Sequence, residues 1–297
     1  MKAGSALVQG AAAPALRRWG RQGAVYGPLP VLGLLMPLLV LLALGLGLPL
    51  AGAVWGSLAG TDGFGESYIS LMNDPLFWTV LLRTITTAAE VSLISVVVGY
   101  PTAEFIARSS AKVRPILLAI VIIPLLSSVI ARTYAWYGVF VRDGVVDRIA
   151  GLFGLPPQRL LYTQTAVMVG MVYILLPLVI LPIYATLRGY DERLTLASSS
   201  LGAGHLRTLV MVKLPILAPV ILAAGTGVYI LALGFFVTPA LLGGPTSQLV
   251  SNLISQQVFQ TFNLPHAQAM SMALLLVTLS SLALGSTALL LMRRRLQ

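Results

Sequence analysis

One carboxylate stands in the middle of a long apolar stretch of the chain. Glu90 falls about halfway along residues 77–107, among mainly Val, Leu, Ile and Ala. Ionisable groups at membrane depth are costly and usually face a cavity or a partner, so Glu90 is a candidate for attracting a cationic solute. The alternative is a buried ion pair with Arg83, seven residues away on about the same helical face, or with Arg132. The sequence leaves both interpretations open.

Three aromatic side chains follow Arg132, near the expected outer end of the third apolar stretch. Tyr134, Trp136 and Tyr137 could wall an entrance and stack on cationic groups of a solute. Alternatively, they form the aromatic belt that anchors helices at a membrane–water interface.

A second polar and aromatic group flanks the Gly-Gly-Pro sequence at residues 243–245. We expect it near the outer side of the fifth apolar stretch. There it predicts either an external gate with a substrate contact or a packed amphipathic surface helix. Its members are Phe235, Phe236, Thr238, Asn252, Gln256 and Gln257.

The sequence holds none of the common catalytic patterns. The chain has no cysteine, which excludes disulfides, thiolate metal sites and cysteine nucleophiles. It has no Gly-Lys-Ser/Thr phosphate loop, HExxH, Gly-x-Ser-x-Gly or carboxylate cluster. Its two histidines lie far apart, and we expect His266 to be structural. We therefore expect no enzyme, no catalytic residue, no metal site and no cofactor bound by this chain.

Membrane-spanning helices must position these residues. The chain has 297 residues, of which 57% are hydrophobic and 9% charged, whereas soluble domains carry roughly 25% charged residues. A helix needs about 20 apolar residues to cross the hydrocarbon, and strand-like alternation is absent. The sequence predicts an all-α integral membrane protein with six transmembrane helices, at about 29–56, 77–107, 115–140, 164–187, 214–237 and 267–292.

The first of these stretches could instead be a signal peptide, because basic residues precede it and Ala51-Gly-Ala53 resembles a cleavage site. Its length exceeds the roughly 7–15 apolar residues of a signal core, so we expect a retained helix. Residues 1–27 are rich in Gly, Ala and Arg and predict a loosely ordered cytoplasmic tail before a transmembrane domain at 28–297.

The basic residues predict an orientation. Fourteen of the 19 Lys and Arg residues lie in the N-terminal tail, in the loops after the second and fourth stretches, and at the C-terminus. The positive-inside rule places these parts, with both termini, in the cytoplasm. The opposite loops are slightly acidic. We attribute the net charge of +10 to topology and contact with lipid headgroups rather than to nucleic acid.

The segment between the fourth and fifth stretches predicts two short helices with a sharp bend. Asp191 can cap the first helix, and Gly202 can end it in a left-handed conformation that a side chain disfavours. A second short helix runs from about Gly204 to Lys213, and Pro215 is tolerated where the next span begins. One side is small and neutral (Ala197, Ser198, Ser199, Ala203), and basic or titratable side chains could reach acidic groups on a partner or anionic lipid (His205, Arg207, Lys213). Just before the second span ends, Glu104 predicts an i,i+4 pair with Arg108.

Residues 196–215 read LASSSLGAGHLRTLVMVKLP, which resembles the cytoplasmic coupling loop of permease subunits of ATP-binding-cassette (ABC) importers. That loop usually has Glu-Ala-Ala, then Gly, and further on a hydrophobic residue followed by Pro. Residues 70–290, roughly three quarters of the chain, resemble the polyamine and opine-type permease group. The matching pieces are MNDPLFWTVLLRTI (72–85), VVVGYPTAEFIAR (96–108), ARTYAWYGVFVRDGVVD (131–147), VMVGMVYILLPLVILPIYATL (167–187) and FVTPALLGGP (236–245).

The resemblance implies a type I importer permease with a coupling loop at 189–213, in which an ABC ATPase dimer docks on Leu196, Ala197, Ser198, Gly202, Ala203, His205, Arg207, Lys213 and Pro215. It also implies a second permease subunit, more often a different chain than a copy, and an extracytoplasmic solute-binding protein in a bacterial inner membrane. ATP and Mg would be used by the ATPase, and the solute would be a polyamine or a related cationic or opine-like compound. Two positions depart from the pattern: Leu196 replaces the usual Glu, and Ala240 replaces an acidic residue of some polyamine permeases.

The alternative function is a secondary carrier or channel that works without an ATPase. Charged relays within the membrane would favour it, but Glu90 is nearly alone. We find no internal repeat of the kind on which many carriers are built. Uptake by this chain alone would distinguish the two functions.

Overall fold

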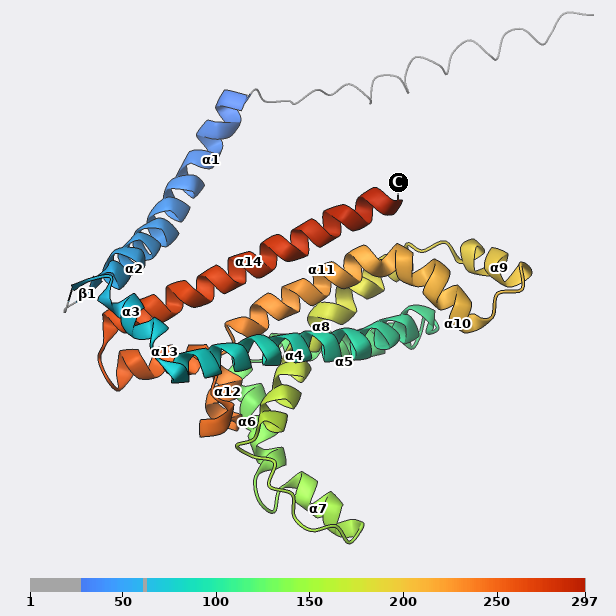
Figure 1. The fold of residues 1–297 in the computed structure, drawn as a ribbon. Coiled ribbons are helices and arrows are strands. Elements are labelled where there is room, and N and C mark those ends of the chain that lie inside the picture. The colour runs from blue at the N-terminus through green and yellow to red at the C-terminus, as the bar shows by residue number, and fades with distance from the viewer. Residues whose placement is uncertain (1–27, 61–62, 297) are drawn as a thin grey trace, which may run out of the picture. The chain divides into compact units, whose positions relative to one another are not determined.

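The computed structural model describes residues 28–60 and 63–296 of the chain (Figure 1). The predicted cytoplasmic tail, residues 1–27, lies outside the described residues. The chain divides into two compact units, which adjoin in sequence at Ala53 and Val54.

The described part of the first unit is one long apolar helix, whose last residues, 54–58, belong to the second unit. α1 (Pro28–Leu42) passes through a short π-helical turn, η1 (Ala43–Gly47), into α2 (Leu48–Leu58). The helix is apolar on all sides over Leu35–Leu58, and this length is sufficient to cross a membrane.

The second unit begins with short elements that lead into the longest helix. A two-stranded antiparallel hairpin, β1 (Ala59–Gly60) and β2 (Gly63–Phe64), is followed by α3 (Glu66–Met72). α4 (Pro75–Arg108) then starts where Asp74 Oδ1 accepts the backbone N–H of Leu76 at 2.9 Å. A side-chain cap followed by Pro is a usual start of a helix, because both satisfy or remove free N–H groups.

The third span is broken rather than continuous, which corrects the prediction of one helix over 115–140. α5 (Arg114–Leu126) and α6 (Val129–Phe140), which leads on to α7 (Val145–Leu152), meet at a bend of 103°. Pro124 lies in the last turn of α5, and Ser127 and Ser128 have extended backbone angles. Because proline provides no N–H, the helical ladder weakens at this point and the chain can turn.

Three long helices form the core of the second unit. α8 (Gln164–Arg188) and α11 (Leu214–Leu233) both pack against α4, and α14 (Leu264–Leu296) packs against α11. Their fully buried side chains are aliphatic or small, among them Val91, Val179 and Val228. A Cβ on Gly99 of α4 would come within 2.8 Å of Val179, so glycine allows α4 and α8 to approach closely.

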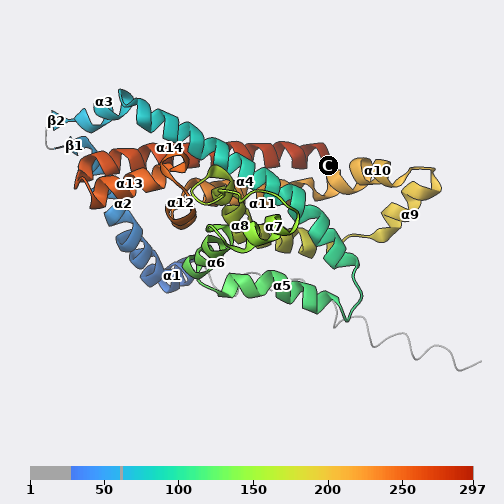
Figure 2. The same cartoon turned by 90° about the horizontal axis from the view of Figure 1, so that it is seen from below.

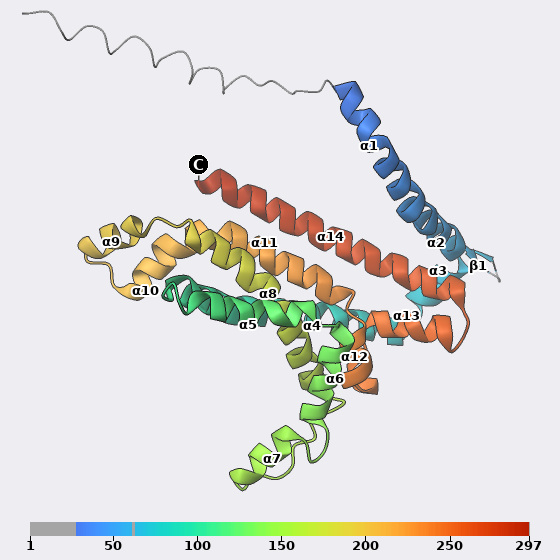
Figure 3. The ribbon, with the colours of Figure 1, turned by 180° about the vertical axis from the view of Figure 1, so that it is seen from behind.

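The remaining short helices lie at opposite ends of this bundle. α9 (Glu192–Ser200) and α10 (His205–Thr208) lie beyond one end of α11, next to the C-terminal end of α4 (Figures 1 and 3). α12 (Val237–Leu242), η3 (Pro245–Ser247) and α13 (Val250–Phe259) lie at the other end. Seen from below, α9 and α10 again project past the long helices (Figure 2). We call residues 191–213 the elbow, and the two ends the elbow end and the pocket end.

The described residues contain five helices that are long and apolar enough to cross a membrane, or six if the bent pair counts as one span. The predicted all-α membrane fold is therefore confirmed, with the small hairpin as its one short β element in the described residues.

Candidate functional site

The elbow begins and ends at the predicted residues. Asp191 Oδ1 accepts the backbone N–H of Arg193 at 2.9 Å and caps α9, with Glu192 in the first turn, where a negative charge is favourable. α9 ends before Gly202, which has φ +80°. In this left-handed region an L side chain is disfavoured, so glycine permits the reversal towards α10.

The second half of the elbow is not a separate short helix, which corrects the prediction. α10, a π-helical turn η2 (Leu209–Lys213) and α11 run on as one continuous helix from Leu206 to Leu233. Pro215 is the second residue of α11, as predicted, although the π-helical turn runs directly into this helix.

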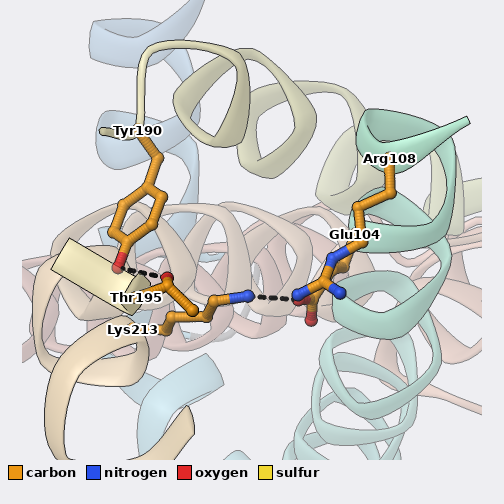
Figure 4. A network of polar contacts seen from close by, with 5 residues as sticks. All are labelled: Glu104, Arg108, Tyr190, Thr195 and Lys213. Carbon is orange, nitrogen blue, oxygen red and sulfur yellow. Dashed lines mark hydrogen bonds and ion pairs between the residues drawn. The ribbon is translucent and has the colours of Figure 1, made fainter. Parts of the chain in front are cut away.

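Hydroxyl groups hold the two arms of the elbow together. The hydroxyls of Ser198 on α9 and Thr208 on α10 lie 2.9 Å apart, and the backbone N–H of Ala203 donates to the Ser198 carbonyl at 3.1 Å. The Tyr190 hydroxyl lies 3.1 Å from that of Thr195, which joins the end of α8 to α9 (Figure 4). Of the residues predicted to form a small, neutral side, Ser198 thus uses its hydroxyl within the elbow, whereas Ala203 takes part through its backbone N–H.

An ion-pair network ties the elbow to α4 (Figure 4). Lys213 Nζ donates to Glu104 Oε1 at 2.7 Å, and Arg108 Nη2 donates to the same oxygen at 2.6 Å. The Glu104–Arg108 pair is the predicted one. Lys213 was predicted to reach a partner or lipid, but its side chain, at the end of η2, is only 7% exposed and points to Glu104 of α4.

This network lines a cavity of about 530 Å³ between α4, the end of α8 and the elbow. Arg188, Tyr190, Glu192 and Leu196 are among the other residues of its wall. The cavity is therefore lined by charged groups of both signs.

The outer surface of the elbow is more apolar than predicted. The side chains of Leu201 and Leu206 are 88% and 75% exposed, and Leu194 and Leu196 are also exposed. The side chain of His205 lies outside the described residues, and Arg207 is exposed. The sequence could have predicted this apolar surface, because leucines in an otherwise polar segment next to a sharp turn are candidates for contact with a partner.

At the pocket end, three predicted residues line one cavity of about 600 Å³. Phe236, Asn252 and Gln256 lie there with residues that the sequence did not single out for a solute: Tyr162, Gln248 and Gln260. Asn252, Gln256 and Gln260 are spaced by four and share one face at α13 and its C-terminal end, and Gln248 joins them from the extended segment before α13. We call this cavity the amide pocket.

Other predicted pathway residues have packing roles. The buried hydroxyl of Thr238 lies 3.2 Å from that of Thr133, and the Phe235 carbonyl accepts the Ser251 hydroxyl at 2.6 Å. Gln257 bonds Thr261 on the turn that follows α13. These residues position the amide pocket without lining it.

The aromatic trio also divides. Trp136 stacks on Phe140 with a centroid separation of 5.1 Å and meets Tyr173 edge-on at 5.4 Å, so it packs within the bundle. Tyr134 is exposed, and its ring lies 6.4 Å from that of Tyr137. Only part of the trio is thus free to meet a solute.

Glu90 is exposed on α4. Among the described residues the ion pairs are those of Glu104, so Glu90 pairs with neither Arg83 nor Arg132. His266 is half-buried beside the start of α14. The described residues contain no group of three or more side chains that could hold a metal ion.

The sequence of the chain is similar to curated proteins over most of its length. It is 33% identical to the "Spermidine/putrescine transport system permease protein PotB" of Escherichia coli K12, over 71% of this chain and 78% of the relative. The Haemophilus influenzae protein of the same name is also 33% identical, over 70% of this chain and 73% of the relative. The chain belongs to the polyamine-type permeases of ABC importers.

The permease also has solved structural neighbours. A bacterial ABC transporter that imports alginate superimposes with a TM-score of 0.72 at 18% identity, over 89% of this chain and 95% of that chain. The MetNI methionine ABC transporter gives 0.55 at 17% identity, over 74% and 99%. These likenesses show the shared fold. No family model matches the permease.

Proposed function

We propose that this permease carries a small cationic solute inward, using ATP that partner subunits hydrolyse. The observation that carries the proposal is the elbow. A capped helix and a left-handed turn project past the spans and are joined to α4 by a buried ion pair. Such a rigid projection can transmit the movement of a docked partner to the bundle. A partner that binds one conformation of the permease more tightly than the other thereby shifts the permease towards that conformation.

The elbow end is proposed to face the cytoplasm. The described loops at this end carry Arg108, Lys112, Arg114, Arg188, Arg193 and Arg207. Cytoplasmic loops carry an excess of such residues. Both termini would then be cytoplasmic, and the pocket end would face the outside of a bacterial inner membrane.

The docking partner is proposed to be an ABC ATPase dimer, which supplies the bound ATP and Mg. Leu196 stands where the family usually has Glu, so an ion pair from that position is replaced by apolar contact. The exposed side chains of Leu194, Leu201 and Leu206 extend this apolar surface. ATP binding would close the ATPases and open the permease outward, and hydrolysis would reset it.

Two further partners complete the proposal. A permease of this size works as one half of a pair, and polyamine-type systems commonly combine two different chains, so we propose a heterodimer. A solute-binding protein would deliver its ligand to the amide pocket, where Phe236, Asn252 and Gln256 are accessible.

The solute is proposed to be a polyamine or another small organic cation. The relatives named above are spermidine/putrescine permeases, and Glu90 supplies a free carboxylate within the second span. Tyr162 and Phe236 add aromatic faces that attract cations. Another relative, 30% identical over 66% of this chain and 70% of its own length, is named as a putative 2-aminoethylphosphonate permease of Salmonella typhimurium, so a different amine-bearing solute is the second candidate.

The docking proposal is tested with charges placed on the elbow. The double variant Leu201→Glu, Leu206→Glu should lose co-purification with the ATPase and at least tenfold of ATP-driven putrescine uptake in proteoliposomes, because it places carboxylates in an apolar contact. Leu152→Glu on α7 is the matched control, since Leu152 is 84% exposed at the far side of the chain from the elbow.

The outcomes separate the parts of the proposal. Uptake by the permease alone, without an ATPase, would establish a carrier and overturn the proposal. An ATPase that docks and hydrolyses ATP without moving putrescine would overturn the solute class alone.

A further inference from the structure

All charged residues of α4 lie on one face of the helix. They are Arg83, Glu90, Glu104 and Arg108. Their separations of seven, fourteen and four residues place them on one side. The opposite side carries Ala88, Val91 and Ser95, which are fully buried against the core.

The middle of this charged face is unsuited to lipid. Glu90 lies 15 residues after the first residue of α4, which is roughly 22 Å along the helix. It is exposed and has no hydrogen-bond or ion-pair partner among the described residues. Carboxylates at this depth face a protein interior or water rather than hydrocarbon.

The two ends of the face lead to the two polar sites of the molecule. Arg83 Nη1 donates to the carbonyl of Gln248, which lines the amide pocket, at 3.5 Å. Glu104 accepts from Lys213 of the elbow. Arg83 and Glu104 are 21 residues apart, roughly 32 Å of helix, which is close to the thickness of the hydrocarbon core.

We propose that this face of α4 borders a water-filled path from the amide pocket towards the elbow end, and that Glu90 makes the path selective for cations. The inference rests on the proposed transport function and deepens it by naming the wall of the path. The path would be closed on its other side by the second permease subunit. A positive group on that subunit, paired with Glu90 in a dry interface, is the competing arrangement.

The absence of cysteine from the chain allows a direct test. Single variants Glu90→Cys and Val97→Cys are made in the permease, and the complete transporter, with its other subunits free of reactive thiols, is placed in proteoliposomes. Val97 is exposed on the same face, seven residues after Glu90. Cationic and anionic methanethiosulfonates, which react with a thiolate in water, are the probes.

The control for lipid exposure is Leu279→Cys on α14. Leu279 is exposed and lies 15 residues after the start of α14, the same number as Glu90 in α4. Both α4 variants should react at least tenfold faster than this control. Rates equal to the control at both positions would overturn the proposal, whether lipid or a dry subunit contact covers the face.

The charge of Glu90 is tested in the Val97→Cys background, where Glu90 is intact. There the cationic reagent should react several-fold faster than the anionic one, and adding Glu90→Gln should remove that preference. A preference unchanged by Glu90→Gln would overturn the selective role of Glu90. ATP-driven uptake by the cysteine-free parent tests the transport function separately, because the labelling rates of the cysteine variants do not depend on uptake.

Discussion

The elbow end and the pocket end of the same bundle differ in that only the elbow end has an ion pair among the described residues. At the elbow end a nearly buried charge pair, Lys213 with Glu104, crosses from the loop to α4. At the pocket end the acceptors are neutral: the hydroxyls of Thr133 and Thr238 lie 3.2 Å apart, and the Arg83 guanidinium donates to the Gln248 carbonyl rather than to a carboxylate. The Ser247 hydroxyl accepts the Gly244 backbone N–H at 2.7 Å and closes the turn before α13.

The two ends also differ in what they leave unpaired. At the elbow end the charged groups of Glu104 and Lys213 are used inside the protein, and leucines remain exposed. At the pocket end, amide side chains such as Gln256 and Gln260 line an open cavity. A joint that transmits force needs fixed partners, whereas a surface that handles a passing solute needs polar groups that are still free.

Breaking the charge pair should have the largest effect. Lys213→Met leaves Glu104 partly buried with only Arg108 beside it, and removing one partner of a buried pair typically costs about 3 kcal/mol. We expect a lower unfolding temperature of the purified permease. ATP-driven uptake should fall at least tenfold, with ATPase still bound, because α4 no longer follows the elbow.

The double variant Glu104→Gln, Lys213→Met is the control, because it removes both charges of the buried pair and leaves only Arg108, which is 52% exposed, without its partner; it should be more stable than Lys213→Met alone. If the pair only stabilises the fold, this double variant should also restore uptake. If the pair transmits movement, stability should recover while ATP hydrolysis continues without uptake. Full uptake by both variants would contradict the contrast between the two ends.

The turn of the elbow should give an intermediate effect. A Cβ on Gly202 or on Gly204 would meet no atom within 4 Å, but only Gly202 has a positive φ. Gly202→Ala should therefore cost about 1 kcal/mol of local stability and loosen α9, whereas Gly204→Ala should cost little. ATPase affinity measured by titration, and hydrogen exchange of the α9 amides, should separate the two variants. Equal behaviour of both would show that the reversal of the chain does not depend on a left-handed residue.

Much of the fold could be predicted from the sequence because each span is a long apolar run with polar ends. The caps were also readable, since Asp191 and Gly202 act through local backbone geometry. The bend between α5 and α6 could not be predicted, although Pro124, Ser127 and Ser128 stand in the sequence at this point. A single proline is tolerated within another span of this chain, Pro101 in α4, so only packing decides where a helix breaks.

The functional sites were harder to predict from the sequence than the helices, because they depend on contacts between residues that are distant in sequence. The Glu104–Arg108 pair is four residues apart and follows from helix geometry. The Lys213–Glu104 pair joins residues that are 109 positions apart in the sequence. Lys213 lies in a π-helical turn, which no local sequence pattern predicted. Likewise the amide pocket needs Tyr162, which is brought to α12 by the bond from its backbone N–H to the Leu242 carbonyl at 2.9 Å.

The smallest effect on stability should come from the amide pocket itself. The side chain of Gln256 is exposed in the cavity, whereas Asn252 Oδ1 accepts the Leu249 backbone N–H at the start of α13. Gln256→Ala should change stability by no more than about 0.5 kcal/mol and raise the KM of uptake several-fold, since it removes a free amide. Asn252→Ala should cost about 1 kcal/mol, because it removes a cap. Thermal unfolding and uptake kinetics of both variants test this difference. A loss of stability in Gln256→Ala without a change of KM would mean that the pocket end, like the elbow end, uses its polar groups to stabilise the fold.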